Sequence, residues 1–169
     1  LIEKEEVSLA FGVPTIWMGL LNYCRENNKT LTSVRNTVIG GAALSRSMLQ
    51  EFDEAHDVNV IQGWGMTEMS PLGTSNFLTP EMKKMSKEER YSVQLKQGRP
   101  MYGVELKVVD DSGEDLPNDG ESQGHLLVRG PWVLKRYFKA EKDAVDKDGW
   151  FDTGDISVLD KDGYMTIKD

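Results

Sequence analysis

The sequence of 169 residues contains only one cysteine, Cys24, and two histidines, so it has few side chains of the kinds that bind zinc or form disulfides. One cysteine cannot form an internal disulfide, and it cannot supply a cysteine-rich zinc site. Neither His56 nor His125 lies in a Ser-His-Asp or Cys-His pattern, so we expect both to be structural or solvent-exposed. Cys24 lies on the apolar face of an expected helix, which predicts a small buried hydrophobic side chain.

Long apolar runs are also missing. No run approaches 18 residues, which argues against a membrane-spanning helix. The first six residues are too acidic and too poor in apolar residues for a signal peptide. They lack an initiator methionine, so we expect the chain to be a piece of a longer protein, and we expect that protein to be cytoplasmic.

Positive charge is scarce, because 20 Lys and Arg stand against 28 Asp and Glu and give a net charge of −8. This balance argues against broad nucleic-acid binding, since neutralising phosphates requires clustered Lys and Arg. Hydrophobic residues make up 38% of the sequence. That share is enough for a core, so we do not expect a disordered chain.

The first half of the sequence alternates between helical and extended patterns, which indicates parallel-sheet units with crossover helices. The mixed Lys and Glu residues of segment 80–90 predict a solvated surface helix or lobe. The expected elements are a helix from Pro14 to about Asn27, a strand at 38–39, a helix over 48–55 with Ser45 as N-cap, and a strand at 58–61 broken by Gly63 and Gly65.

From about residue 100 the apolar period changes to two, which is typical of strands. This half is predicted to be a small antiparallel sheet or barrel. The expected strands cover 104–108, 125–129, 156–159 and 164–167, the last two joined by a hairpin turn at 160–163. The chain therefore divides near Gly98-Arg99-Pro100 into an α/β part, 1–99, and a β-barrel-like part, 100–169.

The segment 62–68 is the most distinctive in the sequence. It follows a buried strand and so lies at the carboxyl edge of a parallel sheet, where open α/β sheets bind ligands. Its glycines allow the backbone to approach a ligand, and Trp64 offers a flat face to a planar ring. Thr67 and Glu68 supply a hydroxyl and a carboxylate suited to phosphate and Mg²⁺. The alternative is a glycine-rich turn with an exposed tryptophan.

Two further segments contain candidates. Asp155 lies between a Thr-Gly turn and a strand, and one carboxylate can accept hydrogen bonds from both hydroxyls of a ribose. The alternative is an aspartate that caps a turn. The four small residues at 40–43 follow a strand and leave room for a ligand or a closely packed helix.

Taken together, these segments resemble the adenylate-forming superfamily, the group of acyl-CoA synthetases, peptide-synthetase adenylation domains and luciferases. The segments that carry the resemblance are 40–42, 63–68, 124–131 and 149–155, and segments 13–17 and 163–169 resemble the fatty acyl-CoA synthetase branch. The resemblance covers nearly the whole chain. It implies an α/β fold followed by a small antiparallel β-barrel, the second half of the family's large N-terminal domain.

The resemblance also implies roles for individual positions. Gly41, Ala42, Gln62, Gly63 and Trp64 would line the nucleotide site, Thr67 would contact phosphates, Glu68 would hold Mg²⁺, and Asp155 would take the ribose hydroxyls. Thr67 and Glu68 are accordingly the implied catalytic residues. Trp17, Gly65 and Met66 would line the acyl pocket, and Asp169 would lie at the hinge before a C-terminal lobe.

The implied activity is that of an AMP-forming acyl-CoA ligase. Such an enzyme uses ATP, Mg²⁺ and CoA to convert a carboxylic acid, fatty or medium-chain, into its acyl-CoA through an acyl-adenylate. The family's phosphate loop and its lysine-bearing lobe are absent from these residues, so we expect the fragment alone to be inactive. Adenylation without CoA, a non-enzymatic nucleotide-binding module, and a homodimer of the full-length protein remain open.

Overall fold

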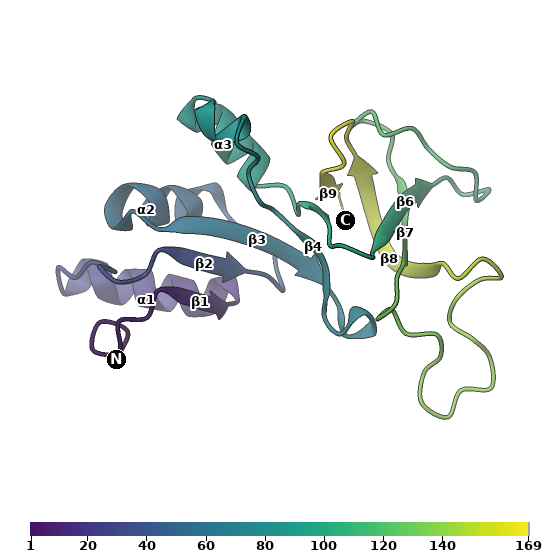
Figure 1. The fold of residues 1–169 in the computed structure, drawn as a ribbon, viewed down its shortest axis with the longest axis horizontal. Coiled ribbons are helices and arrows are strands. Elements are labelled where there is room, and N and C mark those ends of the chain that lie inside the picture. The colour runs from purple at the N-terminus through teal and green to yellow at the C-terminus, as the bar shows by residue number, and fades with distance from the viewer. Residues whose placement is uncertain (169) are drawn as a thin grey trace. The chain divides into compact units, whose positions relative to one another are not determined.

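The computed structural model describes residues 1–168, which form two compact units. The first unit comprises residues 1–63 and 76–95, and the second comprises 64–75 with the described chain from Lys96 onward. Figure 1 shows the helices and strands of each. The subdomain division at residue 99 stays a prediction, and Asp169, the predicted hinge, lies outside the described residues.

The first unit contains parallel strands joined by helices, as the alternating pattern predicts (Figure 1). The strands are β1 (Leu9–Gly12), β2 (Asn36–Ile39) and β3 (Asn59–Gly65), with β1 paired to β2 and β2 paired to β3. The break expected at Gly63 and Gly65 is wrong, because β3 runs through both. A glycine at position 65 serves close packing instead, since an added Cβ would lie 1.8 Å from the carbonyl oxygen of Pro71.

Helices α1 (Pro14–Glu26) and α2 (Arg46–His56) have the predicted caps and faces. Pro14 occupies the first helical position of α1, and the Ser45 hydroxyl accepts a hydrogen bond from the Met48 amide at 3.2 Å. Both helices bury their apolar faces in one hydrophobic core. Cys24 is buried there, and its burial raises the pKa of the thiol, so the expectation of a buried hydrophobic side chain is confirmed.

The two histidines occupy the structural and exposed positions that we expected. His56 is buried beside Phe52, with 6.5 Å between ring centroids, and burial lowers the pKa of its imidazole. His125 is partly exposed, and its Nε2 lies 3.2 Å from an Asp111 carboxylate oxygen. Neither ring contacts another candidate site residue through a hydrogen bond within residues 1–168.

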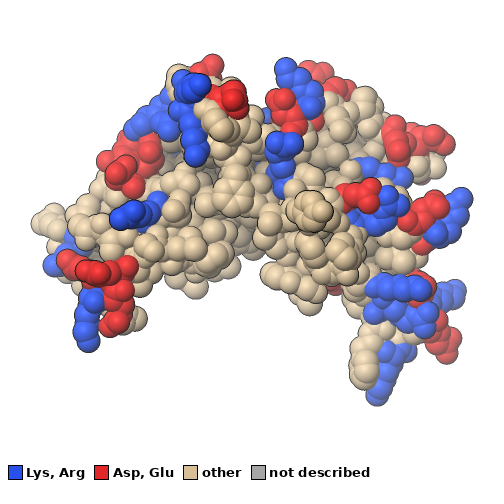
Figure 2. All heavy atoms as spheres, viewed as in Figure 1, with Lys and Arg blue, Asp and Glu red and all other residues tan. Residues whose placement is uncertain are grey.

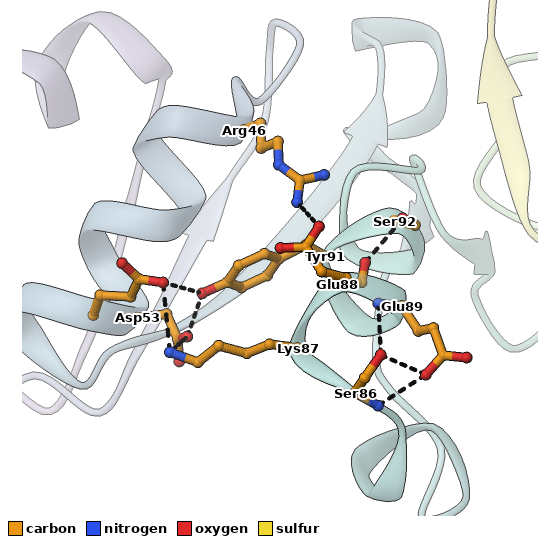
Figure 3. Close-up of polar contacts among 9 residues, drawn as sticks. Arg46, Asp53, Ser86, Lys87, Glu88, Glu89, Tyr91 and Ser92 are labelled. Atoms are coloured by element: carbon orange, nitrogen blue, oxygen red, sulfur yellow. Dashed lines mark hydrogen bonds and ion pairs between the residues drawn. The ribbon is translucent and has the colours of Figure 1, made fainter.

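A polar cluster fastens helix α3 (Lys87–Gln94) to α2 (Figure 3). The Tyr91 hydroxyl donates a hydrogen bond to Asp53, and the Lys87 Nζ lies 3.0 Å from the same carboxylate. Burial alone would raise the pKa of Asp53, but the hydrogen bonds from Tyr91 and Lys87 lower it below its usual value. Segment 80–90, where we expected a surface helix or lobe, contains a short 3-10 turn, η2 (Met82–Lys84), and the start of α3. Helix α3 continues beyond that segment to Gln94.

The second unit is antiparallel, as the period of two predicts. Its elements are η1 (Thr67–Met69), β4 (Leu72–Ser75), β5 (Arg99–Pro100), β6 (Glu105–Val109), β7 (Gly124–Arg129), β8 (Phe151–Leu159) and β9 (Met165–Ile167). β4 pairs with β5, and the other four strands form a sheet in the order β6-β7-β8-β9. Inward-facing side chains such as Leu126 and Val128 build its own core.

Strand β8 begins earlier than we expected. It starts at Phe151, so the Thr-Gly pair before Asp155 lies inside the strand and not in a turn. The pairing with β7 shifts register between His125 and Leu127, and Gly154 has φ +79°. A glycine in this left-handed conformation allows the strand to bulge without ending.

Charged side chains of both signs are intermixed on the face of the molecule drawn in Figure 2. The net charge of −8 is therefore not gathered into one acidic patch on that face. Of the helices in the described part of the chain, none is both long enough and apolar enough to cross a membrane.

Candidate functional site

Four candidates of the first unit, Gly41, Ala42, Gln62 and Gly63, lie around the carboxyl end of β2. The strand register places Ile39 opposite Gln62, so the small residues after Ile39 leave β2 beside Gly63. The approach is close, because a Cβ added to Gly40 would lie 2.9 Å from the Gly63 carbonyl oxygen. The structure therefore brings segment 40–42, which follows the carboxyl end of β2, beside Gln62 and Gly63 of β3.

These first-unit candidates offer backbone and small side chains, with no charge. Gly41 and Ala42 are exposed, and Gly41 has φ +79°. Gln62 is 2% exposed, and its Oε1 has no hydrogen-bond partner among residues 1–168. A buried amide oxygen without a donor is costly, so this carbonyl group is suited to accept a hydrogen bond from a group outside the described chain.

The second unit joins two of the recognised segments through one hydrogen bond. The Trp64 Nε1 donates to Asp155 Oδ2 at 3.0 Å, across 91 residues of sequence. Trp64 is only 9% exposed, so it is not the exposed tryptophan of the alternative interpretation. Its ring packs on Gly73, where an added Cβ would lie 2.7 Å from the ring.

The environment of Asp155 affects its charge in two opposite ways. Burial raises the pKa of this carboxyl above its usual value, and the hydrogen bond from Trp64 partly offsets the rise. A carboxylate that is partly desolvated and already oriented by one donor can accept further hydrogen bonds strongly. The geometry is thus suited to a ligand that donates hydroxyl hydrogen bonds.

Glu68 lies in η1, and a residue that the sequence analysis missed holds its side chain. The Tyr137 hydroxyl donates to Glu68 Oε1 at 2.9 Å, and the Leu134 amide donates to the Glu68 carbonyl oxygen at 2.8 Å. Thr67, at the start of η1, is exposed. The sole sequence signal for Tyr137 was an aromatic residue in the loop after segment 124–131, and nothing local connects it with Glu68.

The predicted acyl-pocket residues are divided between the units. Trp17 belongs to the first unit, is 3% exposed, and meets Phe52 edge to face with ring centroids 5.5 Å apart. Gly65 and Met66 belong to the second unit and are half-buried. The assignment of these three residues to an acyl pocket stays a prediction.

The carboxylate of Glu68 is suited to bind a metal that arrives together with a nucleotide. Within the described residues, no group of three or more His, Cys, Asp or Glu side chains could hold an ion. Glu68 offers a single half-buried carboxylate, one oxygen of which Tyr137 engages. Because Mg²⁺ is commonly held by one or two carboxylates together with substrate phosphates, Glu68 fits Mg²⁺ that arrives with a nucleotide.

Comparisons with known proteins agree on one family. The sequence model of the family called AMP-binding enzyme matches residues 1–138. The 3-methylmercaptopropionyl-CoA ligase of Ruegeria pomeroyi is 52% identical over 169 residues, and the match covers all of this chain and 31% of that protein. The medium-chain-fatty-acid–CoA ligase of Ectopseudomonas oleovorans is 47% identical, with the same coverage of both chains.

Solved structures show the same fold. The long-chain-fatty-acid-CoA ligase FadD1 from Archaeoglobus fulgidus matches with a TM-score of 0.81 and 28% identity, over 99% of this chain and 35% of that chain. The O-succinylbenzoate coenzyme A synthetase of Bacillus subtilis, in complex with ATP and magnesium ion, matches with a TM-score of 0.77 and 30% identity, over 99% and 32%. The chain spans about a third of the length of the curated relatives that it matches.

Proposed function

Because the chain belongs to the AMP-binding enzyme family, we propose that it is part of an ATP-dependent, AMP-forming acyl-CoA ligase. The proposed substrates are ATP, CoA and an aliphatic carboxylic acid. The acid is of the medium-chain or 3-methylmercaptopropionate class, after which two of its relatives are named. The observation that carries the proposal is the Trp64–Asp155 hydrogen bond, which joins the two segments to which nucleotide roles are assigned.

The proposed nucleotide contacts are those that the family resemblance implies. We assign the adenine to Gln62, Gly63 and Trp64, with Gly41 and Ala42 on its other side. Asp155 accepts hydrogen bonds from the two ribose hydroxyls, and Trp64 orients the carboxylate by holding Oδ2. The small residues at 40–42 support this assignment, because they keep side-chain bulk away from the end of β2 and from the neighbouring Gln62 and Gly63 of β3.

The chemical steps would be two displacements. A carboxylate oxygen of the acid attacks the α-phosphorus of ATP, and pyrophosphate leaves. The CoA sulfur then attacks the acyl carbon as its proton is lost, and AMP leaves. Thr67 would donate its hydroxyl hydrogen to a phosphate oxygen, and Glu68 would hold Mg²⁺, which supplies positive charge against the phosphates.

The remaining assignments belong to the same proposal. Trp17, Gly65 and Met66 would contact the acyl chain, and the indole of Trp17 is held in place by Phe52. The chain would divide into an α/β part, 1–99, and a β-barrel-like part, 100–169, with the hinge at Asp169. The full-length protein would be a cytoplasmic enzyme.

The test is a panel of acids with the full-length enzyme. We expect acid-dependent ATP–pyrophosphate exchange, and acyl-CoA formation when CoA is added, with 3-methylmercaptopropionate or octanoate preferred to an amino acid. Absence of exchange with every acid would overturn the proposal. Exchange without any acyl-CoA product would replace it with adenylation onto another acceptor.

A single substitution tests the assignment of the metal. Glu68→Gln keeps the shape of the side chain and removes its charge, so we expect exchange to fall roughly 100-fold or more. The circular dichroism spectrum should not change. The matched control is Glu141→Gln, which neutralises an exposed glutamate in the loop between β7 and β8 and should leave exchange unaffected.

A further inference from the structure

The loop that follows β7, residues 130–138, lies against segment 68–72 within the second unit. Two of its hydrogen bonds end on Glu68, one from the Leu134 amide to the carbonyl oxygen and one from the Tyr137 hydroxyl to the side chain. Two more bind the neighbours of Glu68: the Ser70 hydroxyl donates to the Trp132 carbonyl at 3.4 Å, and Trp132 Nε1 donates to the Leu72 carbonyl at 3.1 Å. The loop therefore holds both the backbone and the side chain at position 68.

The contact on the Glu68 carboxylate is asymmetric. Tyr137 bonds Oε1 at 2.9 Å, whereas Oε2 has no hydrogen-bond partner in the described chain. A carboxylate with one oxygen held by a directional donor loses rotational freedom, so its second oxygen points in a restricted range of directions. The Glu68 side chain is thus oriented before any ligand binds.

Tyr137 is itself held in place, although it is half-exposed. The two residues before it, Lys135 and Arg136, both form ion pairs with Asp143. The Arg136 guanidinium lies 2.6 Å from Asp143 Oδ1. The Ala144 amide also donates to the Lys135 carbonyl oxygen at 2.8 Å. A tyrosine hydroxyl keeps its proton at neutral pH, so Tyr137 is a donor to Glu68.

We propose that Tyr137 is a positioning residue for the reaction: it holds Oε1 of Glu68 so that Oε2 is presented to the Mg²⁺ of MgATP. This inference rests on the proposed function through the assignment of Glu68 to the metal. Groups that orient a metal ligand typically change metal affinity or activity 10- to 100-fold when they are removed. The phenol hydroxyl of Tyr137 is a group of this kind.

The first test compares two tyrosines of the full-length enzyme. Tyr137→Phe should raise the Mg²⁺ concentration for half-maximal ATP–pyrophosphate exchange by roughly tenfold and leave the KM of the acid unchanged. Tyr102→Phe is the matched control, because its side chain is 99% exposed and it makes no hydrogen bond in the described residues. If the two variants respond to Mg²⁺ alike, the proposal is wrong.

The second test is a double-mutant cycle with Glu68→Gln. If Tyr137 acts through Glu68, the double variant should be no slower than Glu68→Gln alone. Additive losses would overturn the positioning role while leaving the assignment of Glu68 intact. If Glu68→Gln by itself exchanges like the wild type, the assignment of Glu68 to the metal has failed instead.

A third measurement does not depend on activity. The affinity for MgATP is measured by calorimetry in the absence of the acid and CoA. We expect it to be lower in Tyr137→Phe than in Tyr102→Phe. Equal affinities in the two variants would overturn the proposal.

Discussion

The two units of this molecule hold candidate residues of different chemistry. In the first unit, segment 40–42 with Gln62 and Gly63 contributes backbone, small side chains and an unpartnered amide oxygen. In the second unit, Glu68 and Asp155 are carboxylates, and one aromatic side chain holds each of them. The candidates at 40–42, 62 and 63 in the first unit are thus uncharged, whereas Glu68 and Asp155 in the second unit are carboxylates that are already oriented.

Charge is present in the first unit as well, but it is used differently there. Asp53 is satisfied by Tyr91 and Lys87, and Glu88 is paired with Arg46 (Figure 3). All of these partners are side chains of α2 and α3. The charged groups of this cluster therefore fasten α3 to α2, whereas Glu68 and Asp155 of the second unit keep acceptor capacity for a ligand.

The largest effect should come from a glycine of the second unit. Gly65→Ala would place a Cβ 1.8 Å from a backbone oxygen, so backbone must move, and we expect the free energy of unfolding to fall by about 3 kcal/mol or more. Gly40→Ala is the first-unit counterpart, with its Cβ 2.9 Å from a backbone oxygen. In urea denaturation of the full-length enzyme, Gly40→Ala should lower the free energy of unfolding less than Gly65→Ala does. A larger loss for Gly40→Ala would contradict the inference that Gly65 is the more tightly packed glycine.

Asp155→Asn should affect ATP more than it affects the fold. Loss of hydrogen bonds to a charged group costs about 1.5–3 kcal/mol, so the KM for ATP should rise roughly 10- to 100-fold. The raised pKa of Asp155 means that its charged form is disfavoured in the folded state. Neutral Asn should therefore leave the melting temperature at neutral pH unchanged or higher, and a lower one would contradict this account.

Trp64→Phe should have a smaller effect on ATP of the same kind. It keeps an aromatic ring and removes the donor to Asp155. The lost hydrogen bond is worth about 1 kcal/mol, so we expect the KM for ATP to rise several-fold. The hydrogen bond lowers the pKa of Asp155, so its loss should move the acid limb of the pH profile for ATP binding to higher pH. An unmoved limb would remove Trp64 as the group that orients Asp155.

Asp53→Asn should lower the free energy of unfolding and leave the KM for ATP unchanged. We expect a loss of about 1 kcal/mol at neutral pH. The pKa of Asp53 is lowered in the folded state, so its stabilisation is present above the ordinary carboxyl pKa and is lost as the pH falls through the folded-state value. Urea titrations at several pH values should show the wild-type advantage shrinking in acid, and a changed KM for ATP would break the distinction between the two units.

The smallest effect is expected at the exposed pair of Arg46 and Glu88. Both side chains are substantially exposed, so solvent screens the pair, and Arg46→Gln should change the free energy of unfolding by less than about 0.5 kcal/mol. A loss as large as that of Asp53→Asn, measured in the same urea titration, would mean that the whole cluster acts as one network.

Local sequence was sufficient for much of the fold. The spacing from Trp17 to Cys24, the cap at Ser45 and the turn at 160–163 each predicted the element that is observed. Each of these signals acts within a few residues, through helical periodicity, a capping hydroxyl or turn geometry. The antiparallel sheet β6–β9 was also readable, because the apolar period changes to two near residue 100.

Other features depended on contacts between distant segments. The continuation of β3 through Gly65 and the early start of β8 at Phe151 depend on how neighbouring segments pack and pair, and glycine patterns alone predicted breaks or turns there. For the site, the sequence nominated Glu68 and Asp155 but could not name the groups that hold them. Those partners lie 69 and 91 residues away, and only the packed second unit, with its strand register and loop 130–138, brings each aromatic donor within hydrogen-bonding distance of its carboxylate.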